Sequence, residues 1–238
     1  YSDASLVMIP SGYKTSKVYS AVPTDGTGDL AFTRSNDTAT RVASNGLIEK
    51  VRTNLILQSQ AFNTTWSTGS VSVTANTTAN PLNGAVNADT ITLTGATTQK
   101  YLAQSNVFNG SSTISVYLKA GTHQFVQLML GTDATPFANF DLINGTASAT
   151  SSTATIVSAG SGFFRCSMSF ASTTGTDVFI TAADSLATTR FQSTASTGTF
   201  IAFGCQVETG DIATAYIATT TAAVSVGPVA NVPPFGLP

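Results

Sequence analysis

The feature that most constrains this fold is a series of short segments in which apolar and polar residues alternate. The clearest runs from Thr113 to Lys119, where Ile114, Val116 and Leu118 would point to one side of a strand. A period of two residues is typical of a β-strand with one buried face. Turn residues separate about ten such segments, and no convincing amphipathic helix interrupts them. The sequence therefore predicts an all-β protein.

The composition favours the same fold class. Only 9% of the 238 residues are charged, against about 25% in a typical soluble domain, and Ser and Thr together exceed a quarter of the chain. Thr suits the half-exposed face of a pleated sheet, whereas the good helix formers Lys and Glu are scarce. The chain is also long enough to bury a sizeable core. Short strands with turns between them describe a β-sandwich of the jelly-roll type.

The same segments predict local pairings. Thr113–Lys119 and His123–Leu130 are separated by a tight Ala-Gly-Thr turn, so we expect them to form a hairpin. Further turns are expected at Asn109-Gly110 and Asn144-Gly145, since Asn-Gly is a strong hairpin signal. Ala182–Ala195 would hold either one helical turn or a long loop.

The two ends of the chain do not share this pattern. Residues 9–42 are interrupted repeatedly by Pro and Gly, and six of the ten basic residues lie at or before Arg52. Such a segment cannot bury much of itself, so we expect an arm that docks onto another surface. The end of the chain carries Pro228, Pro233 and Pro234 and should be extended. We therefore expect an arm at 1–51, a sandwich at 52–220 and a tail at 221–238.

The charge and the hydropathy of the chain limit the kinds of partner that we expect this protein to have. The net charge is −2 and the basic residues of the arm are widely spaced, which argues against nucleic acid. No apolar run approaches the roughly 20 residues that a membrane span needs. A hydroxyl-rich surface of low charge suits a protein that works inside an assembly.

Catalytic and metal-binding motifs are not evident. His123 is the sole histidine, and no nucleophile elbow, metalloprotease helix motif, phosphate-binding loop or facing pair of carboxylates is seen. Asp89, Asp133 and Asp141 offer oxygen ligands that suit Ca²⁺, but no dense acidic loop accompanies them. The sequence predicts no enzyme, no cofactor and no metal.

Two cysteines are too few for a disulfide scaffold in a chain of this length. Cys166 and Cys205 each alternate with apolar residues, so we expect buried free thiols. A bridge between neighbouring strands is the alternative.

Exposed aromatic side chains with neighbouring amides are what a sugar-binding sandwich would need. Trp66 could belong to such a platform or to the core, and Tyr117 would lie on the face opposite Ile114 and Val116. The candidate glycan contacts are Trp66, Tyr101, Tyr117 and Gln127, with Phe137, Gln104 and Gln124 as further candidates.

Three blocks of sequence stand out as a set. The first block is Ile9-Pro-Ser-Gly-Tyr-Lys-Thr-Ser-Lys-Val-Tyr19 with Phe32–Ser35, Ala39–Val42 and Gly46–Glu49. The second block is Arg52–Leu55 through Phe62 and Trp66. The third block is Ser115–Gly121, Gly162–Cys166, Gly204–Glu208 and Ala215–Ile217 with Thr219-Thr220. Together these blocks resemble a family of tailed-bacteriophage virion proteins, the tail-fibre, head-fibre and decoration proteins with a carbohydrate-binding-module-like sandwich. The resemblance covers residues 9–220.

The resemblance implies a jelly-roll sandwich, a place on the virion surface after synthesis in the host cytoplasm, and homotrimers. It implies no catalytic residue. The partner would be the major capsid protein or a tail protein, with a capsid decoration (cement) or short head-spike role expected first. A tail-fibre adhesin that recognises host surface glycans is the alternative. The residues expected to dock on the virion are Tyr13, Lys14, Lys17, Tyr19, Arg34 and Arg41.

One feature departs from that family. Many relatives have a longer link between the first two blocks, but only Lys50 and Val51 separate Glu49 from Arg52 here. The arm and the sandwich could therefore form one continuous unit.

Overall fold

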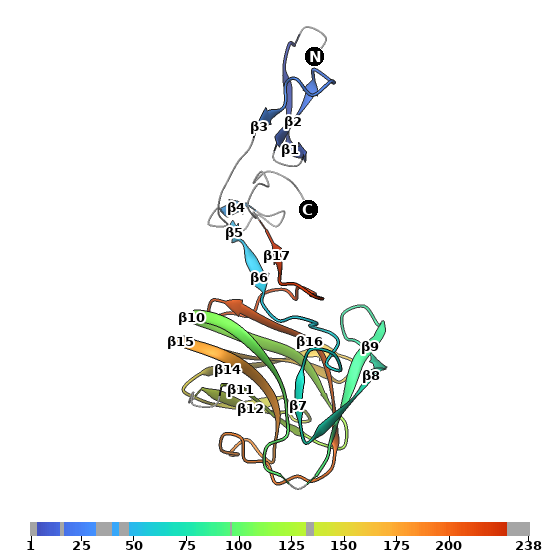
Figure 1. Cartoon of the computed structure of the whole chain (residues 1–238), viewed down its shortest axis with the longest axis vertical. Coiled ribbons are helices and arrows are strands. Elements are labelled where there is room, and N and C mark those ends of the chain that lie inside the picture. The colour runs from blue at the N-terminus through green and yellow to red at the C-terminus, as the bar shows by residue number, and fades with distance from the viewer. Residues whose placement is uncertain are drawn as a thin grey trace. The chain divides into compact units, whose positions relative to one another are not determined.

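The computed structural model describes residues 4–14, 17–31, 40–42, 48–95, 97–131 and 136–227, and the regular structure of these residues is entirely β (Figure 1). The all-β prediction is confirmed. The chain divides into two compact units, Tyr1–Arg52 with Ser225–Pro238, and Thr53–Val224. The C-terminal residues thus group with the N-terminal segment, where the sequence suggested a separate third part. Over the described residues, no helix has the length and apolar character of a membrane span.

The unit that contains both ends is built of short antiparallel strands. β1 (Val7–Lys14), β2 (Lys17–Val22) and β3 (Leu30–Ala31) form one sheet, and β4 (Thr40–Val42) pairs with β5 (Ile48–Lys50). In the turn before β3, Asp29 Oδ1 accepts from both the amide and the hydroxyl of Ser20, at 2.9 Å each. Backbone pairing between short strands therefore orders part of the expected arm.

β6 (Arg52–Asn54) and β17 (Val224–Val226) pair with each other where the chain passes between the units. The second unit holds one large antiparallel sheet, ordered β13-β12-β11-β15-β10-β16-β9-β8, with β14 also on β15 and β7 also on β10. Its strands are β7 (Ser67–Gly69), β8 (Val71–Ala79), β9 (Val86–Leu93), β10 (Tyr101–Ala120), β11 (Phe125–Leu130), β12 (Phe137–Asp141), β13 (Thr146–Thr150), β14 (Thr153–Gly160), β15 (Phe163–Ala183) and β16 (Thr199–Thr209).

Two strands of about twenty residues, β10 and β15, contradict part of the expected pairing. No turn forms at Asn109-Gly110, because β10 continues through it with register shifts on either side of Gly110. The hairpin expected between Thr113–Lys119 and His123–Leu130 is also wrong, since β15 lies between β10 and β11. The turn at Asn144-Gly145 is confirmed as the link between β12 and β13.

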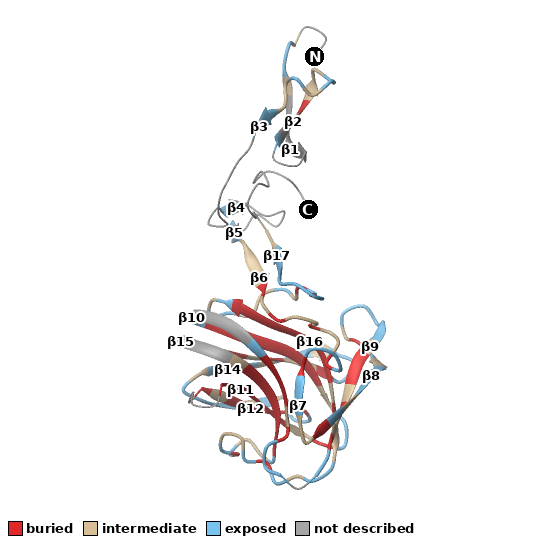
Figure 2. Ribbon diagram, viewed as in Figure 1, coloured by how far each residue is buried: buried red, intermediate tan, exposed pale blue. Residues whose placement is uncertain are grey.

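The long strands change partners along their length. The first half of β15 pairs with β14 and the second half with β11, while β10 pairs with β7 at its start and with β16 at its end. Strands that exchange neighbours in this way carry a sheet from one layer to another. The arrangement is consistent with a β-sandwich, and the buried residues run along β10, β15 and β16 (Figure 2).

One large cluster of apolar side chains forms the core of the sandwich. Alternate residues near both ends of β15 and in the second half of β10 enter it, including Ile114, Val116 and Leu118 as the alternation predicts. Ile56, Phe62 and Trp66 join the cluster from the segment before β7. Two small satellite clusters, around Tyr117 and around Phe179, lie outside it.

A bulge in β16 resets which side chains face out. The register with β10 shifts between Ser115 and Tyr117, and Gly204 takes a φ of 62° there. An extra residue in one strand reverses the alternation beyond it. Phe203 therefore packs on the outer face with Tyr117, whereas Cys205 returns to the core.

Candidate functional site

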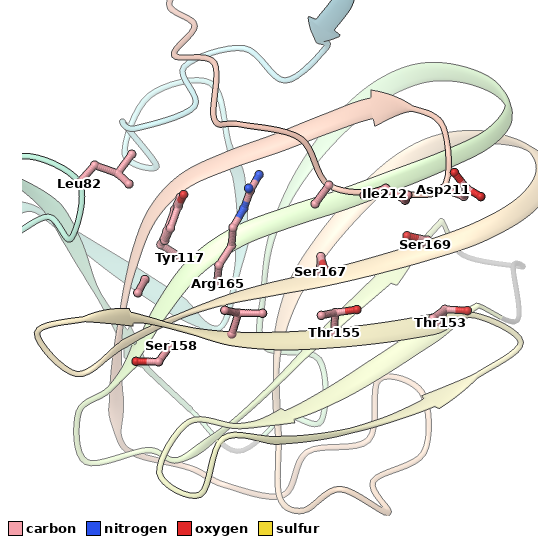
Figure 3. Close-up of a pocket in the computed structure, with 13 residues that line it drawn as sticks. Leu82, Tyr117, Thr153, Thr155, Ser158, Arg165, Ser167, Ser169, Asp211 and Ile212 are labelled. Carbon is pink, nitrogen blue, oxygen red and sulfur yellow. The ribbon is translucent and has the colours of Figure 1, made fainter. Parts of the chain in front are cut away.

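A groove of about 480 Å³ lies on the outer face of β14, β15 and β10 (Figure 3). That size falls within the usual range for small-molecule sites. We call it the Arg165 groove. Its floor is side chains of the three strands, and Asp211, Ile212 and Ala213, which follow β16, form one wall.

Cross-strand pairing sets the floor out in three rows. The first row is Val157, Arg165 and Tyr117, each directly opposite the next. The second row is Thr155, Ser167 and Ser115, and the third is Thr153, Ser169 and Thr113. Alternate residues on a strand are about 7 Å apart, so the three rows span about 14 Å.

Small side chains in the second and third rows create the depth of the groove. Ser167 and Ser169 line it, are much smaller than Arg165 and Tyr117 of the first row, and leave space above the sheet. The groove surface is consequently rich in hydroxyl groups, each of which can both donate and accept hydrogen bonds. A second hollow of about 610 Å³ shares Thr153, Ser169 and Asp211 with the first, so the surface is hollowed beyond the third row.

Arg165 provides the positive charge of the groove. Its Nη2 donates to Ser115 Oγ at 3.0 Å, and its guanidinium carbon lies 5.5 Å from the centre of the Tyr117 ring. Its Nε is enclosed and has no hydrogen-bond partner. Among the described residues no carboxylate pairs with Arg165, although Asp211 lines the same groove. Figure 3 shows Arg165 and Asp211 in different parts of the groove.

Tyr117 is held in place by other aromatic rings. It is only 6% exposed and lies 6.0 Å from the Phe203 ring centre and 6.2 Å from that of Tyr216. Burial raises the pKa of Tyr216 to about 12, and its hydroxyl shares a 2.6 Å hydrogen bond with Ser59 Oγ. Tyr117 therefore meets the groove from a rigid cluster rather than as the exposed platform that the alternation suggested.

Two buried polar side chains of β16 fix the wall. Glu208 Oε1 accepts from the amide of Thr214 at 2.8 Å, and Oε2 accepts from the Thr214 hydroxyl at 2.6 Å. Gln206 Nε2 donates to Glu208 Oε1 at 2.8 Å, and its Oε1 accepts from the amide of Ile217 at 2.7 Å. Hydrogen bonds to a charged acceptor are the stronger kind, so this network keeps the wall at a set distance from the floor.

The rim of the groove carries exposed apolar side chains. Leu82, Val157 and, on the wall, Ile212 are 51%, 57% and 72% exposed. Together with the hydroxyl floor they make a surface that could hold the apolar and polar faces of one ligand at once.

The sequence-predicted glycan contacts do not come together. Tyr101 and Tyr117 both lie on β10 and both face away from the core, but sixteen residues separate them, or about 50 Å of strand. Tyr101 belongs instead to an aromatic cluster with Phe179 and Phe191, at ring-centre distances of 5.3 and 5.5 Å. A smaller hollow of about 210 Å³ opens beside this cluster.

Trp66 and Gln127 are structural in this fold. Trp66 is 5% exposed, packs on Phe62 with ring centres 5.0 Å apart, and belongs to the core, which is the alternative that the sequence left open. Gln127 is fully buried, donates to Asn139 Oδ1 at 2.7 Å and accepts from the amide of Phe191. The loop after β15 covers it, so it does not reach the surface as expected.

The other amide and aromatic candidates also have local partners. Gln104 is buried and exchanges hydrogen bonds with the backbone of Leu57. Gln124 donates to Asp141 Oδ1 at 2.8 Å, and Phe137 packs against the Phe179 cluster.

The carboxylates weighed as calcium ligands are separate. Asp89 accepts from the amides of Phe62 and Asn76, and burial raises its pKa. Burial also acts to raise the pKa of Asp141, but hydrogen bonds from Asn144, Gln124 and Ile143 outweigh it and lower the pKa to about 2. Asp133 lies outside the described residues. Within the described part of the chain no three potential metal ligands gather.

The cysteines are buried and unbridged. Cys166 pairs with Val116 on one side of β10, and Cys205 lies in the β16 bulge on its other side. Two strand spacings, about 10 Å, separate them, which exceeds the reach of a disulfide. Burial raises the pKa of both thiols, so they act as small apolar groups.

Of the residues expected to dock on a virion, Arg34 lies outside the described residues. Tyr13 and Lys14 fall in β1, Tyr19 in β2 and Arg41 in β4, but their side chains lie outside what the structure describes. Lys17 begins β2 and is exposed.

Arg165, Gln206 and Glu208 were not among the site residues predicted from the sequence. A signal for Arg165 was present, because Phe164 and Cys166 alternate with it and place it on the outer face. Nothing local in the sequence indicates that Glu208 would hold Thr214. Comparison with models of protein families and with curated proteins finds no match to this chain.

Proposed function

We propose that this chain is a structural protein of a tailed-bacteriophage particle, a capsid decoration (cement) or short head-spike protein. Its N-terminal segment docks on the virion and its sandwich, of the jelly-roll type, faces outward. Its partner is the major capsid protein, it assembles as a homotrimer, and the Pro-rich tail lies extended against the particle. Symmetry would repeat a modest interface many times and so multiply its effect.

The observation that carries the proposal is the division of the chain. The segment whose motifs resemble a phage docking arm falls within a compact unit of its own, apart from Thr53–Val224. The low-charge, hydroxyl-rich composition supports a place in an assembly. The long strands with exchanged neighbours support a jelly-roll class of sandwich.

Localisation on the intact particle tests the proposal. Immunogold labelling with an antibody to the sandwich should decorate the head at many equivalent positions. Removal of residues 1–46 should abolish incorporation, while the free protein stays folded. Label at the tail tip would rule out the decoration role, and normal incorporation of the truncated chain would show that the anchor lies elsewhere.

The Arg165 groove supports a second candidate function, a tail-fibre adhesin that binds host surface glycans. The groove joins a hydroxyl-lined floor to an apolar rim, which suits the two kinds of surface that a sugar ring presents. Retention of the purified protein on a glycan array, lost in a variant with a filled groove, would support this function.

A further inference from the structure

We infer that the Arg165 groove binds an acidic oligosaccharide and that Arg165 receives the carboxylate of a uronic or sialic acid residue. This inference rests on the second candidate function, glycan binding. It specifies that the ligand is negatively charged and that Arg165 recognises this charge.

The first argument is charge. Arg165 is the basic residue among those that line the groove, and within the described part of the chain Ser115 Oγ is the one acceptor of its guanidinium. An arginine carries five N–H donors in a rigid fork that matches the two oxygens of a carboxylate. The Tyr117 ring holds the guanidinium from one side at 5.5 Å, which limits the conformations it would lose on binding. Since Nε is enclosed, the remaining N–H groups of the two Nη atoms are the donors held ready for a planar anion.

The second argument is the chemistry of the rest of the groove. Beyond Arg165 the floor offers the hydroxyls of Thr155, Ser167, Thr153 and Ser169, with no further basic group. Sugar hydroxyls can both donate hydrogen bonds to these side-chain hydroxyls and accept hydrogen bonds from them. The carboxylate of Asp211 can accept two further hydrogen bonds from sugar hydroxyls. The expected ligand thus has one acidic unit at Arg165 and hydroxyl-bearing units along the floor toward Asp211.

The middle of the floor offers no place for a peptide strand. Peptides that add to a sheet need an edge with free backbone groups. β15 and β10 are paired on both sides, so their backbone groups are already used. Recognition above these two strands, where Arg165 lies, must come from side chains.

The test uses the full chain and a glycan array that presents uronic and sialic acid oligosaccharides beside their methyl esters. The ester removes the charge and adds one methyl group. The wild-type protein should bind acidic members at least tenfold more tightly than their esters, and this preference should weaken as salt rises. Arg165→Gln should lose the preference, and Arg165→Lys should keep only part of it, because lysine lacks the planar fork.

Two further variants act as controls. Lys119→Gln removes one positive charge from β10 outside the groove and should bind like wild type, which tests for a general charge effect. Ser167→Val fills the middle row of the floor and should weaken binding of acidic and esterified glycans alike. Thermal unfolding of each variant checks that the sandwich is intact.

The outcomes distinguish a failure of this inference from a failure of glycan binding, the function on which it rests. Equal binding of acids and esters, or an unchanged preference in folded Arg165→Gln, would overturn the inference and leave glycan binding in place. No retention of any glycan by the wild-type protein would overturn both.

Discussion

Buried polar side chains hold a surface loop of this sandwich in place through hydrogen bonds. Gln127 and Asn139 face outward from β11 and β12, yet both are enclosed because the loop after β15 passes over them. Asn139 Nδ2 donates to the carbonyls of Leu186 and Thr188, at 3.1 and 2.8 Å. The polarity of a side chain in the sequence therefore does not show whether it contacts a ligand at the surface or holds a loop in place.

His123 should make stability depend on pH. It is 8% exposed, its Nε2 is enclosed without a partner, and burial lowers its pKa below 6.5. Above pH 6.5 it is neutral in both states. Below that pH the unfolded chain binds the proton more readily than the folded one, so the free energy of unfolding falls, by at most about 1.4 kcal/mol per pH unit.

Urea unfolding at pH 7, 6 and 5 measures this effect. His123→Gln should flatten the decline over this range. Asp141 and Asp184 titrate at about pH 2, so their contribution is lost only at lower pH and does not confuse the comparison. An unchanged pH profile in His123→Gln would show that another group is responsible.

At the scale of elements, the long strands and the segments that cross them decide where the groove lies. β10 brings Tyr117 opposite Arg165 of β15, and the bulge at Gly204 adds Phe203 to the same face. The segment after β16 then becomes a wall because Glu208 holds Thr214 from below. Each element contributes one side of the hollow.

Glu208→Gln should loosen the wall without unfolding the sandwich. The substitution removes the negative charge that accepts from the amide and hydroxyl of Thr214, and such bonds are worth about 1.5–3 kcal/mol. Hydrogen exchange of the Thr214 amide should become at least tenfold faster.

An amide elsewhere in the same protein serves as the control for this measurement. The amide of Asn76 donates to Asp89 at 2.9 Å, lies in β8 rather than in the segment after β16, and should exchange as in wild type. Equal acceleration at both amides would indicate global destabilisation, and no change at Thr214 would contradict the role given to Glu208.

At the scale of the whole molecule, the described apolar clusters all lie within Thr53–Val224. Since apolar burial is the main source of stability, this unit should fold by itself. A fragment of residues 53–224 should unfold cooperatively at nearly the urea midpoint of the full chain.

A shorter fragment provides the matched control. Residues 60–224 lack Asn54, whose Nδ2 donates to the carbonyls of Cys205 and Ile217, and lack Ile56, which is fully buried. This fragment should be less stable by about 2–5 kcal/mol, as expected for the loss of a buried large side chain. Failure of 53–224 to fold would show that the residues of the other unit are needed.

The sequence alone determined the fold class and the content of the core. A period of two residues specifies which side chains of a strand share a face, and Ile114, Val116 and Leu118 lie where it predicts. The same local rule indicated that the cysteines would be buried. These properties depend on neighbours two residues apart, so they can be read without knowing the fold.

Only the tertiary structure decided which strands meet. Arg165 and Tyr117 are 48 residues apart in the chain, and their pairing depends on β15 lying beside β10 in one register. The expected hairpin between β10 and β11 was wrong for the same reason, because periodicity specifies a face but not a neighbour. The groove depends on the order of the strands, on the bulge at Gly204 and on the segment that follows β16. None of these three features can be recognised from a short stretch of the sequence.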